Sequence, residues 1–279
     1  MHDASTTRHT MADVSVIIPC YCCADSVVRA VDSVLGQSLP PAEIILIDDA
    51  SPDDGATLEC LRGLIDSTHI PVYLIELPEN LGPAGARNAA WAVATSTYVA
   101  LLDADDAWHK EKLALQYGWM TAHPEVALCG HACMEVGVMP EDAALNSDVQ
   151  AMPWNLRSML FKNPLATRSA MLRRDIPIRF SADKRYAEDY LLWLQIAAAD
   201  LHVVVLDAIL AYSFKPAFGI SGLSSRMCRM ECGVQDDFRR LRESGDIGIG
   251  LWLAAAGFSL LKYLRRLTIT GLRRVAGKP

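Results

Sequence analysis

Apolar runs alternate with segments of helical periodicity through the first part of the chain. The runs are short, rich in Val, Ile and Leu, and bounded by Pro, Gly, Asp or Asn, which is typical of buried strands. They occupy residues 14–19, 43–47, 71–76 and 97–102. Strands that alternate with helices form a parallel, doubly wound sheet. The sequence therefore predicts an α/β fold that binds its ligand beyond the carboxyl ends of the strands.

Helices are expected between these runs, and a polar leader before them. Helices are expected near residues 25–35, 54–67 and 109–122, and the segment Asn80–Asn88 is expected to lead into an Ala-rich helix that ends near Thr95. Asp25 or Ser26 is expected to cap the first helix, because either side chain can accept a hydrogen bond from a free N–H group. Residues 1–12 are polar and aperiodic, so we expect a disordered leader there.

Three carboxylates follow the fourth apolar run, in Asp103-Ala104-Asp105-Asp106. If the strand continued past Leu102, Asp103 and Asp105 would point to the same side. Such a pair offers hard oxygen ligands, which suit Mg²⁺ or Mn²⁺ between protein carboxylates and substrate phosphates. The alternative is a solvated turn that caps the next helix, because Asp is a preferred N-cap residue.

Two further polar residues lie at the predicted carboxyl edge of the sheet. Asp49 could accept a hydrogen bond from the N–H of a uracil ring or from ribose hydroxyls. Arg87 lies near the start of a helix, where anions are favoured, and suits a diphosphate. Its alternative is a surface ion pair. The run Gly82–Gly85 fits neither a dinucleotide fingerprint nor a P-loop, so a nucleotide site of another kind is indicated.

Four linked segments resemble the nucleotide-binding half of family 2 glycosyltransferases, which have the GT-A fold. The segments are Val14–Tyr21, Asp48-Asp49, Asn80–Asn88 and Asp103–Asp106. The resemblance extends over residues 13–115 and implies a Rossmann-like, mostly parallel sheet flanked by helices. The family commonly has Asn after the tyrosine, whereas this chain has Cys22, so that loop is expected to differ.

The resemblance also implies a ligand and roles for individual residues. By position, it assigns nucleotide binding to Pro19, Tyr21, Asp49, Arg87 and Asp103. The first three would line the nucleoside pocket, and the arginine would lie near the diphosphate or the sugar. Asp103 would face the ribose and the metal, and Asp105 would bind the metal. The implied cofactor is Mn²⁺ or Mg²⁺, and the implied donor is a nucleotide sugar.

The segment Tyr186–Leu194 opens with acids and continues as an apolar helix. On its own, the pair Glu188-Asp189 could simply compensate the dipole of a first helical turn. Family 2 glycosyltransferases carry a Glu-Asp pair at this distance after the Asp-x-Asp motif, and its second residue acts as the base. The resemblance therefore implies that Asp189 takes the proton from the acceptor hydroxyl in an inverting transfer.

The resemblance weakens after the strand that is expected to follow the segment Tyr186–Leu194. Many relatives carry a His there that helps to hold the metal or the diphosphate, but Tyr212–Phe218 contains none. Lys215 is either a diphosphate contact in its place or an exposed lysine.

The net charge bears on the ligands that the protein binds, and the cysteine content bears on the compartment in which it works. The formal net charge of −7 argues against a general nucleic-acid-binding protein. Eight cysteines occur without the features of a signal peptide, so we expect reduced thiols in a cytoplasmic protein. The pairs Cys129/Cys133 and Cys228/Cys232 could contribute to a metal site at helical spacing. Without a second pair nearby, they are more typical of small buried residues.

The last segment is basic and amphipathic. Residues 247–261 are uncharged, but these 15 positions are fewer than the roughly 20 that a membrane-spanning helix needs. On a helical wheel, bases and apolar residues take opposite sides: Lys262, Arg265, Arg266 and Arg273 against Leu260, Leu264, Leu267 and Val275. This pattern is typical of a helix in the membrane interface, with its bases near anionic headgroups. The alternative is a helix packed on the domain with a basic outer face.

The sequence thus predicts an enzyme with three parts after its leader. They are a nucleotide-sugar-binding half (13–130), an acceptor-binding half (131–225) and C-terminal helices (226–279), with peripheral membrane contact through residues 247–279. The resemblance implies a metal-dependent, inverting transfer from a UDP-sugar to a hydroxyl of a glycan or lipid-linked acceptor. It further implies surface polysaccharide synthesis on the inner face of the plasma membrane.

Two other functions stay open. A catalytically silent homologue could bind nucleotide at the membrane, although it would have no chemical need for Asp103, Asp105 and Asp189 together. A sugar-phosphate nucleotidyltransferase has a related sheet, but it needs a glycine-rich loop with a basic residue after the first strand. Pro19–Cys23 supplies neither feature.

Overall fold

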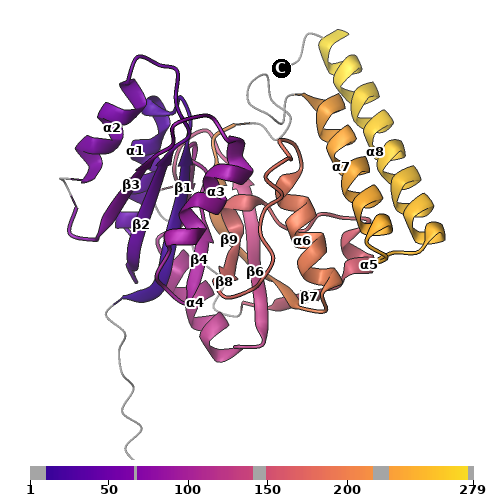
Figure 1. The fold of residues 1–279 in the computed structure, drawn as a ribbon, viewed down its shortest axis with the longest axis horizontal. Helices are drawn as coiled ribbons and strands as arrows, with labels where there is room; N and C mark the ends of the chain where they lie inside the picture. Colours follow the sequence, from indigo (N-terminus) through magenta and orange to yellow (C-terminus); the bar gives the residue numbers. More distant parts are fainter. Residues whose placement is uncertain (1–10, 66–67, 141–148, 216–225, 276–279) are drawn as a thin grey trace, which may run out of the picture.

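A central sheet runs through the molecule, with helices on both of its faces (Figure 1). The structure is a computed structural model that describes residues 11–65, 68–140, 149–215 and 226–275. The described strands are β1 (Ala12–Cys20), β2 (Pro41–Asp48), β3 (Val72–Glu76), β4 (Tyr98–Leu101), β5 (Asp106–Trp108), β6 (Val126–Glu135), β7 (Ala151–Trp154), β8 (Met171–Arg173) and β9 (His202–Ser213). Their order is β3-β2-β1-β4-β8-β6-β9-β5, and β7 pairs with β9.

The helices divide between the two faces of the sheet. They are α1 (Ala24–Leu35), α2 (Ala56–Ile65), α3 (Gly82–Val93), α4 (Lys112–Ala122), α5 (Leu156–Met159), the 3₁₀ turn η1 (Thr167–Ser169), α6 (Glu188–Ala198), α7 (Met227–Glu243) and α8 (Ile249–Val275). Buried side chains of α1, α2 and α4 join one core cluster, and those of α3, α6 and α7 join the other. The sheet is therefore covered on both sides, as the sequence predicted.

Burial on both faces explains the uninterrupted apolar runs of the first four strands. These strands pair in parallel in the order β3-β2-β1-β4. Ile17 lies between Ile45 and Leu101 across the sheet, and all three belong to one core cluster. Their chain neighbours Val16 and Ile44 belong to the other. A strand buried on both sides needs no polar face, so the α/β prediction is confirmed here.

The second half of the sheet mixes strand directions. β8 is antiparallel to both β4 and β6, β6 and β9 are parallel, and β5 and β7 are antiparallel to β9. The 3₁₀ turn η1 directly precedes β8. The Trp108 side chain donates to the Arg168 carbonyl of this turn at 2.8 Å, which helps to hold it. The expected boundary at residue 130 falls within β6, and the division into two halves stays a proposal.

The strand before the three acids ends earlier than predicted. β4 stops at Leu101, and the Asp106 N–H donates to the Asp103 carbonyl at 3.1 Å, closing a turn. Asp103 and Asp105 therefore do not share one side of a continuing strand. The helix-cap alternative is wrong as well, because α4 begins only at Lys112 and has no side-chain cap.

The starts of β1 and α1 also differ from the prediction. β1 begins at Ala12, so that residue belongs to the sheet, while residues 1–10 of the expected leader lie outside the described residues. The N-cap of α1 is Cys23, whose carbonyl accepts the N–H of Ser26 at 2.9 Å. Neither Asp25 nor Ser26 is the cap, because the helix starts before both of them.

The helices α7 and α8 lie side by side at the end of the molecule opposite α2 (Figure 1). Arg266 pairs with Glu231 of α7 at 3.3 Å, and Lys262 donates to the Phe161 carbonyl at 2.9 Å. Two of the bases that were expected on one side of this helix thus contact the protein itself. For these two, both the predicted position near lipid headgroups and the alternative of a basic outer face are wrong.

The outer side of α8 is apolar instead. Its exposed large apolar residues are Ile249, Leu253, Phe258, Leu260, Leu261, Leu264, Leu267 and Ile269. In the described part of the chain, no helix combines the length and the apolar content that spanning a bilayer requires.

Candidate active site

A cavity of about 990 Å³ opens at the carboxyl ends of β1 and β4. Its lining contains all the residues that the sequence singled out for binding or catalysis: Pro19, Tyr21, Asp49, Arg87, Asp103, Asp105 and Asp189. Parallel strands carry the first of these residues to the same edge of the sheet, where ligands bind in open α/β sheets. The structure therefore brings the predicted site residues together.

Arg87 connects the two acidic motifs of this cavity. It lies on α3 and is buried, with 4% of its surface exposed. One Nη donates to Asp103 at 2.7 Å and the other donates to Glu188 at 2.9 Å. Burial lowers the pKa of Arg87, but the two carboxylates together raise it above its usual value. The alternative of a surface ion pair is therefore wrong.

Asp49 organises the loop that leads into α3. One of its carboxylate oxygens accepts the Leu81 N–H at 2.7 Å, and the other accepts the Asn80 side-chain amide at 3.0 Å. Burial raises the pKa of Asp49, and hydrogen bonds from the backbone of Leu81 and Gly82 oppose this shift. Each oxygen has a further lone pair, so the carboxylate can accept a ligand hydrogen bond while it holds the loop.

The acids of the turn after β4 each face a different cation. Asp103 pairs with Arg87, and Asp105 pairs with Lys215 at 2.8 Å. Asp106 is buried and pairs with Arg168 at 2.7 Å. Lys215 is half exposed, and it also lines the cavity. It is thus part of the site, which the sequence left open.

Asp103 and Asp105 form a donor set that fits a divalent cation. Both carboxylates line the cavity and stay partly accessible, with 26% and 34% of their side-chain surface exposed. Two carboxylates leave the other ligand positions to phosphate oxygens and water, which is how Mg²⁺ is usually held beside a nucleotide. Among the described residues, no cluster of three or more His, Cys, Asp or Glu side chains could hold a metal.

Asp189 lies in the first turn of α6 and faces the same cavity. Thr167 donates to its Oδ2 at 2.8 Å, and the Tyr190 N–H donates to its Oδ1 at 2.7 Å. Burial raises the pKa of Glu188, and the adjacent Asp189 carboxylate adds to this effect against Arg87. The two acids thus differ in environment: Glu188 is buried against a cation, whereas Asp189 is held by neutral donors.

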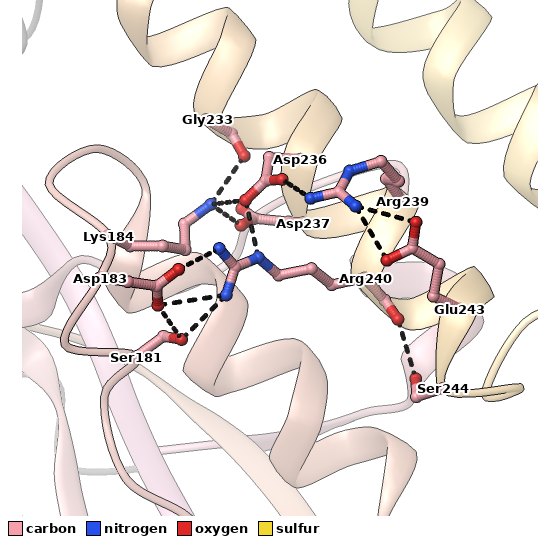
Figure 2. Close-up of polar contacts among 10 residues, drawn as sticks. All are labelled: Ser181, Asp183, Lys184, Gly233, Asp236, Asp237, Arg239, Arg240, Glu243 and Ser244. Carbon is pink, nitrogen blue, oxygen red and sulfur yellow. Dashed lines mark hydrogen bonds and ion pairs between the residues drawn. The ribbon is translucent and has the colours of Figure 1, made fainter.

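The loop before α6 is tied to α7 by charged side chains (Figure 2). Lys184 is buried and donates to Asp237 and to the Gly233 carbonyl, the latter at 2.9 Å. Arg240 of α7 reaches back to Asp183 at 2.5 Å. Ala187, the next residue before the acidic pair, has a positive φ of 57°. The first turn of α6 is therefore positioned by a helix that follows it in the chain.

Several cavity residues were not predicted from the sequence: Thr167, Arg168, Arg185, Tyr186, Arg226 and Arg229. Only Tyr186 had a signal, as a neighbour of the Glu-Asp pair. The others lie in segments without strand-end or motif patterns, and tertiary packing alone brings them to the cavity.

All eight cysteines are free thiols in the structure. Cys129 is buried, but Cys228 and Cys232 are exposed on α7. The prediction of small buried residues is therefore wrong for this second pair.

The comparison with protein families matches residues 15–168 to a model described as Glycosyl transferase family 2. A curated relative from Escherichia coli is named UDP-Glc:alpha-D-GlcNAc-diphosphoundecaprenol beta-1,3-glucosyltransferase WfaP. It is 32% identical over 184 residues, which are 66% of this chain and 69% of that protein.

Solved structures share the fold. Mannosyltransferase PcManGT from Pyrobaculum calidifontis, in complex with GDP-Man and Mn²⁺, has a TM-score of 0.67 at 20% identity and covers 94% of this chain and 76% of its own. TarS from S. aureus, in complex with UDP-GlcNAc, has a TM-score of 0.61 at 20% identity, with 81% and 66% covered. At 20% identity, the similarity to these two structures establishes that the chain shares their fold.

Proposed function

The chain belongs to glycosyl transferase family 2, and from that premise we propose that it is a metal-dependent, inverting glycosyltransferase. Its donor is a UDP-sugar, and its acceptor is a hydroxyl of a lipid-linked glycan. The observation that carries the proposal is the single cavity that holds the strand-end acids, Arg87 and Asp189 together. Any one of these residues on its own would be compatible with many other functions.

The donor assignment is supported by residues at the β1 and β2 ends of the cavity. Pro19 and Tyr21 line one wall, and Asp49 offers a carboxylate that can accept from a uracil N–H. The E. coli relative uses UDP-Glc according to its name. These points favour a uracil nucleotide over other nucleotides.

Asp103 and Asp105 are the residues that would hold Mn²⁺ or Mg²⁺. A divalent cation supplies positive charge that neutralises the departing nucleoside diphosphate. Arg87 orients Asp103, since its guanidinium donates directly to that carboxylate. Lys215 lies beside Asp105 and adds a second positive charge at the cavity wall.

Asp189 is the proposed base. Inverting transfer requires a carboxylate that removes the proton of the acceptor hydroxyl while this oxygen attacks the anomeric carbon. Thr167 and the Tyr190 N–H fix the orientation of Asp189, and no cation pairs with it among the described residues. The carboxylate can therefore accept the proton without first breaking an ion pair.

The acceptor is proposed to reach the site from the membrane. The outer side of α8 presents a row of exposed leucines, with Leu260, Leu261 and Leu264 between 46% and 67% exposed. A helix with such a face lies in the lipid interface when bases flank it. The proposal includes peripheral contact of α8 with the inner face of the plasma membrane, in surface polysaccharide synthesis.

A transfer assay tests the proposed function. Purified protein is incubated with Mn²⁺, a panel of UDP-sugars and a synthetic α-GlcNAc diphospholipid, and UDP release and product are measured. The expected product carries a new linkage whose anomeric configuration is opposite to that of the donor, as read by NMR. A product of retained configuration would contradict the inverting mechanism. Absence of transfer and hydrolysis with every donor would favour the silent homologue.

A further inference from the structure

We propose that Arg226 and Arg229 form a phosphate-binding subsite that holds the diphosphate of the lipid-linked acceptor. The inference rests on the proposed function and deepens it, because it assigns acceptor recognition to residues of α7 and its N-cap. Both arginines line the cavity that contains Asp189. Neither belongs to the motifs by which the family was recognised.

The two guanidinium groups converge on one neutral oxygen. Arg226 donates to the Tyr186 hydroxyl at 3.1 Å, and Arg229 donates to the same oxygen at 3.2 Å. Neither has a carboxylate partner among the residues that the structure describes. Two cations held side by side without a counter-charge repel one another, and a bound anion relieves that repulsion. Arginine donors also match the oxygens of a phosphate in pairs.

Other arginines of α7 are neutralised within the protein. Arg239 pairs with Asp236 and Glu243, and Arg240 pairs with Asp183. The helix therefore supplies acids to Arg239 and Arg240 and none to the two arginines at its start. The guanidinium groups at the start of α7 are therefore the ones that can bind an anion.

The position of the pair favours the acceptor over the donor. Tyr186 lies three residues before Asp189, the proposed base that must face the acceptor hydroxyl. Arg185, by contrast, donates to Asn80 at 2.6 Å, beside Asp49 on the nucleoside side of the cavity. The start of α7 also lies beside the leucine-bearing part of α8, since Glu231 pairs with Arg266. A lipid on α8 would bring its diphosphate to this end of the cavity.

The test compares two probes that differ only in the diphosphate. These are α-GlcNAc diphosphodecyl and the decyl glycoside of GlcNAc, each titrated calorimetrically into the full chain without donor. For the double variant Arg226→Gln/Arg229→Gln, we expect affinity for the diphosphate probe to fall at least tenfold. Affinity for the glycoside and for UDP with Mn²⁺ should stay within twofold of wild type. Arg157→Gln/Arg242→Gln removes the same charge at exposed positions outside the cavity and should change none of the three affinities.

Three results would overturn the subsite. They are equal loss of affinity for both probes, an unchanged affinity for the diphosphate probe, and a fall in UDP affinity of the same size. The last would assign the arginines to the donor diphosphate. Restoring arginine-like charge with Arg226→Lys/Arg229→Lys should recover part of the lost affinity. Because binding is read without turnover, a wild-type enzyme that fails to transfer sugar would refute the proposed function separately.

Discussion

At the scale of single residues, Arg87 is the link between the two acidic motifs of the cavity. It donates to Asp103 on one side and to Glu188 on the other, and these residues lie 16 and 101 positions away in the sequence. A displacement of the Asp103 carboxylate would therefore shift Arg87, and with it the Glu188 carboxylate. The reverse also holds. The arginine couples the donor end of the proposed site to the helix that carries the base.

The first prediction concerns this buried arginine. Arg87→Met should lower the free energy of unfolding by about 3–5 kcal/mol, because it leaves two carboxylates without their cation in a buried place. Urea unfolding followed by circular dichroism measures the effect.

The matched control is Arg62→Met, which removes the exposed pair with Glu76. That pair should contribute less than about 1 kcal/mol. Equal effects of the two substitutions would show that Arg87 does not hold its carboxylates as the structure indicates.

The second prediction concerns Asp189. Asp189→Asn keeps the size of the side chain and its bond from Thr167, but removes the proton acceptor. Turnover should fall about 10²–10⁴-fold, as expected for loss of a general base. The affinity for UDP should stay close to wild type in a calorimetric titration. Wild-type turnover of the variant would exclude Asp189 as the base.

The sequence predicted which residues line the cavity better than how they are held. Asp103, Asp105 and Asp189 belong to local motifs, so their identity could be predicted. The pairing of Arg87 with Glu188 and of Asp105 with Lys215 depends on how distant segments pack. No periodicity or spacing encodes such contacts, and a surface ion pair was as compatible with the sequence as the buried one.

At the scale of elements, α7 braces the loop that leads into α6. The carbonyl of Gly233 accepts from Lys184, and a Cβ at this glycine would lie 2.6 Å from the Tyr186 carbonyl oxygen. The helix and the loop thus approach each other more closely than any side chain at position 233 would allow.

The third prediction follows from this close approach. Gly233→Ala should push the Tyr186 backbone away and lower stability by about 1–3 kcal/mol, the usual cost of overpacking. Turnover should fall as well, because the shifted loop leads directly into the first turn of α6, which carries Asp189. Thermal unfolding and a transfer assay measure the two effects.

Gly118→Ala in α4 is the control for helix propensity. A Cβ at Gly118 meets nothing within 4 Å, so this substitution should stabilise the helix by about 0.5–1 kcal/mol. If Gly233→Ala, like the control, lowered neither stability nor turnover, the close contact between α7 and the loop would not be what positions the loop.

Most elements could be predicted from their apolar periods, but their ends could not. α4 starts at Lys112, three residues after the expected position, and β4 ends at Leu101, before the acids. The residues between Leu101 and Lys112 include a turn and the short strand β5. β5 exists because β9 offers it a partner, which a local pattern cannot reveal.

At the scale of the whole molecule, α8 leaves an apolar face without a partner in the described protein. The sequence predicted an amphipathic helix correctly, but not that Lys262 and Arg266 would turn inward. Both find acceptors on other segments, a backbone carbonyl and Glu231, and such acceptors are invisible on a helical wheel. The exposed leucines are therefore the part of the helix that is free to contact lipid.

The fourth prediction tests that face. Leu260→Glu/Leu264→Glu should reduce co-sedimentation with vesicles of anionic lipid at least tenfold, since each burial of a leucine contributes about 1.5–3 kcal/mol. Val138→Glu, at an exposed position far from α8 in the sequence, should leave sedimentation unchanged. Equal sedimentation of all three proteins would exclude α8 as the membrane contact.

The most direct test of the proposed donor site is the affinity for UDP, measured by calorimetry in Mn²⁺ and in EDTA. Wild-type protein should bind UDP at least tenfold more tightly in Mn²⁺, because Asp103 and Asp105 would hold the cation, which would supply positive charge to the diphosphate. In Asp105→Asn, the affinity in Mn²⁺ should fall to the level seen in EDTA. Binding of UDP that is equally tight in both conditions, or absent in both, would contradict a metal-dependent nucleotide-sugar site in this cavity.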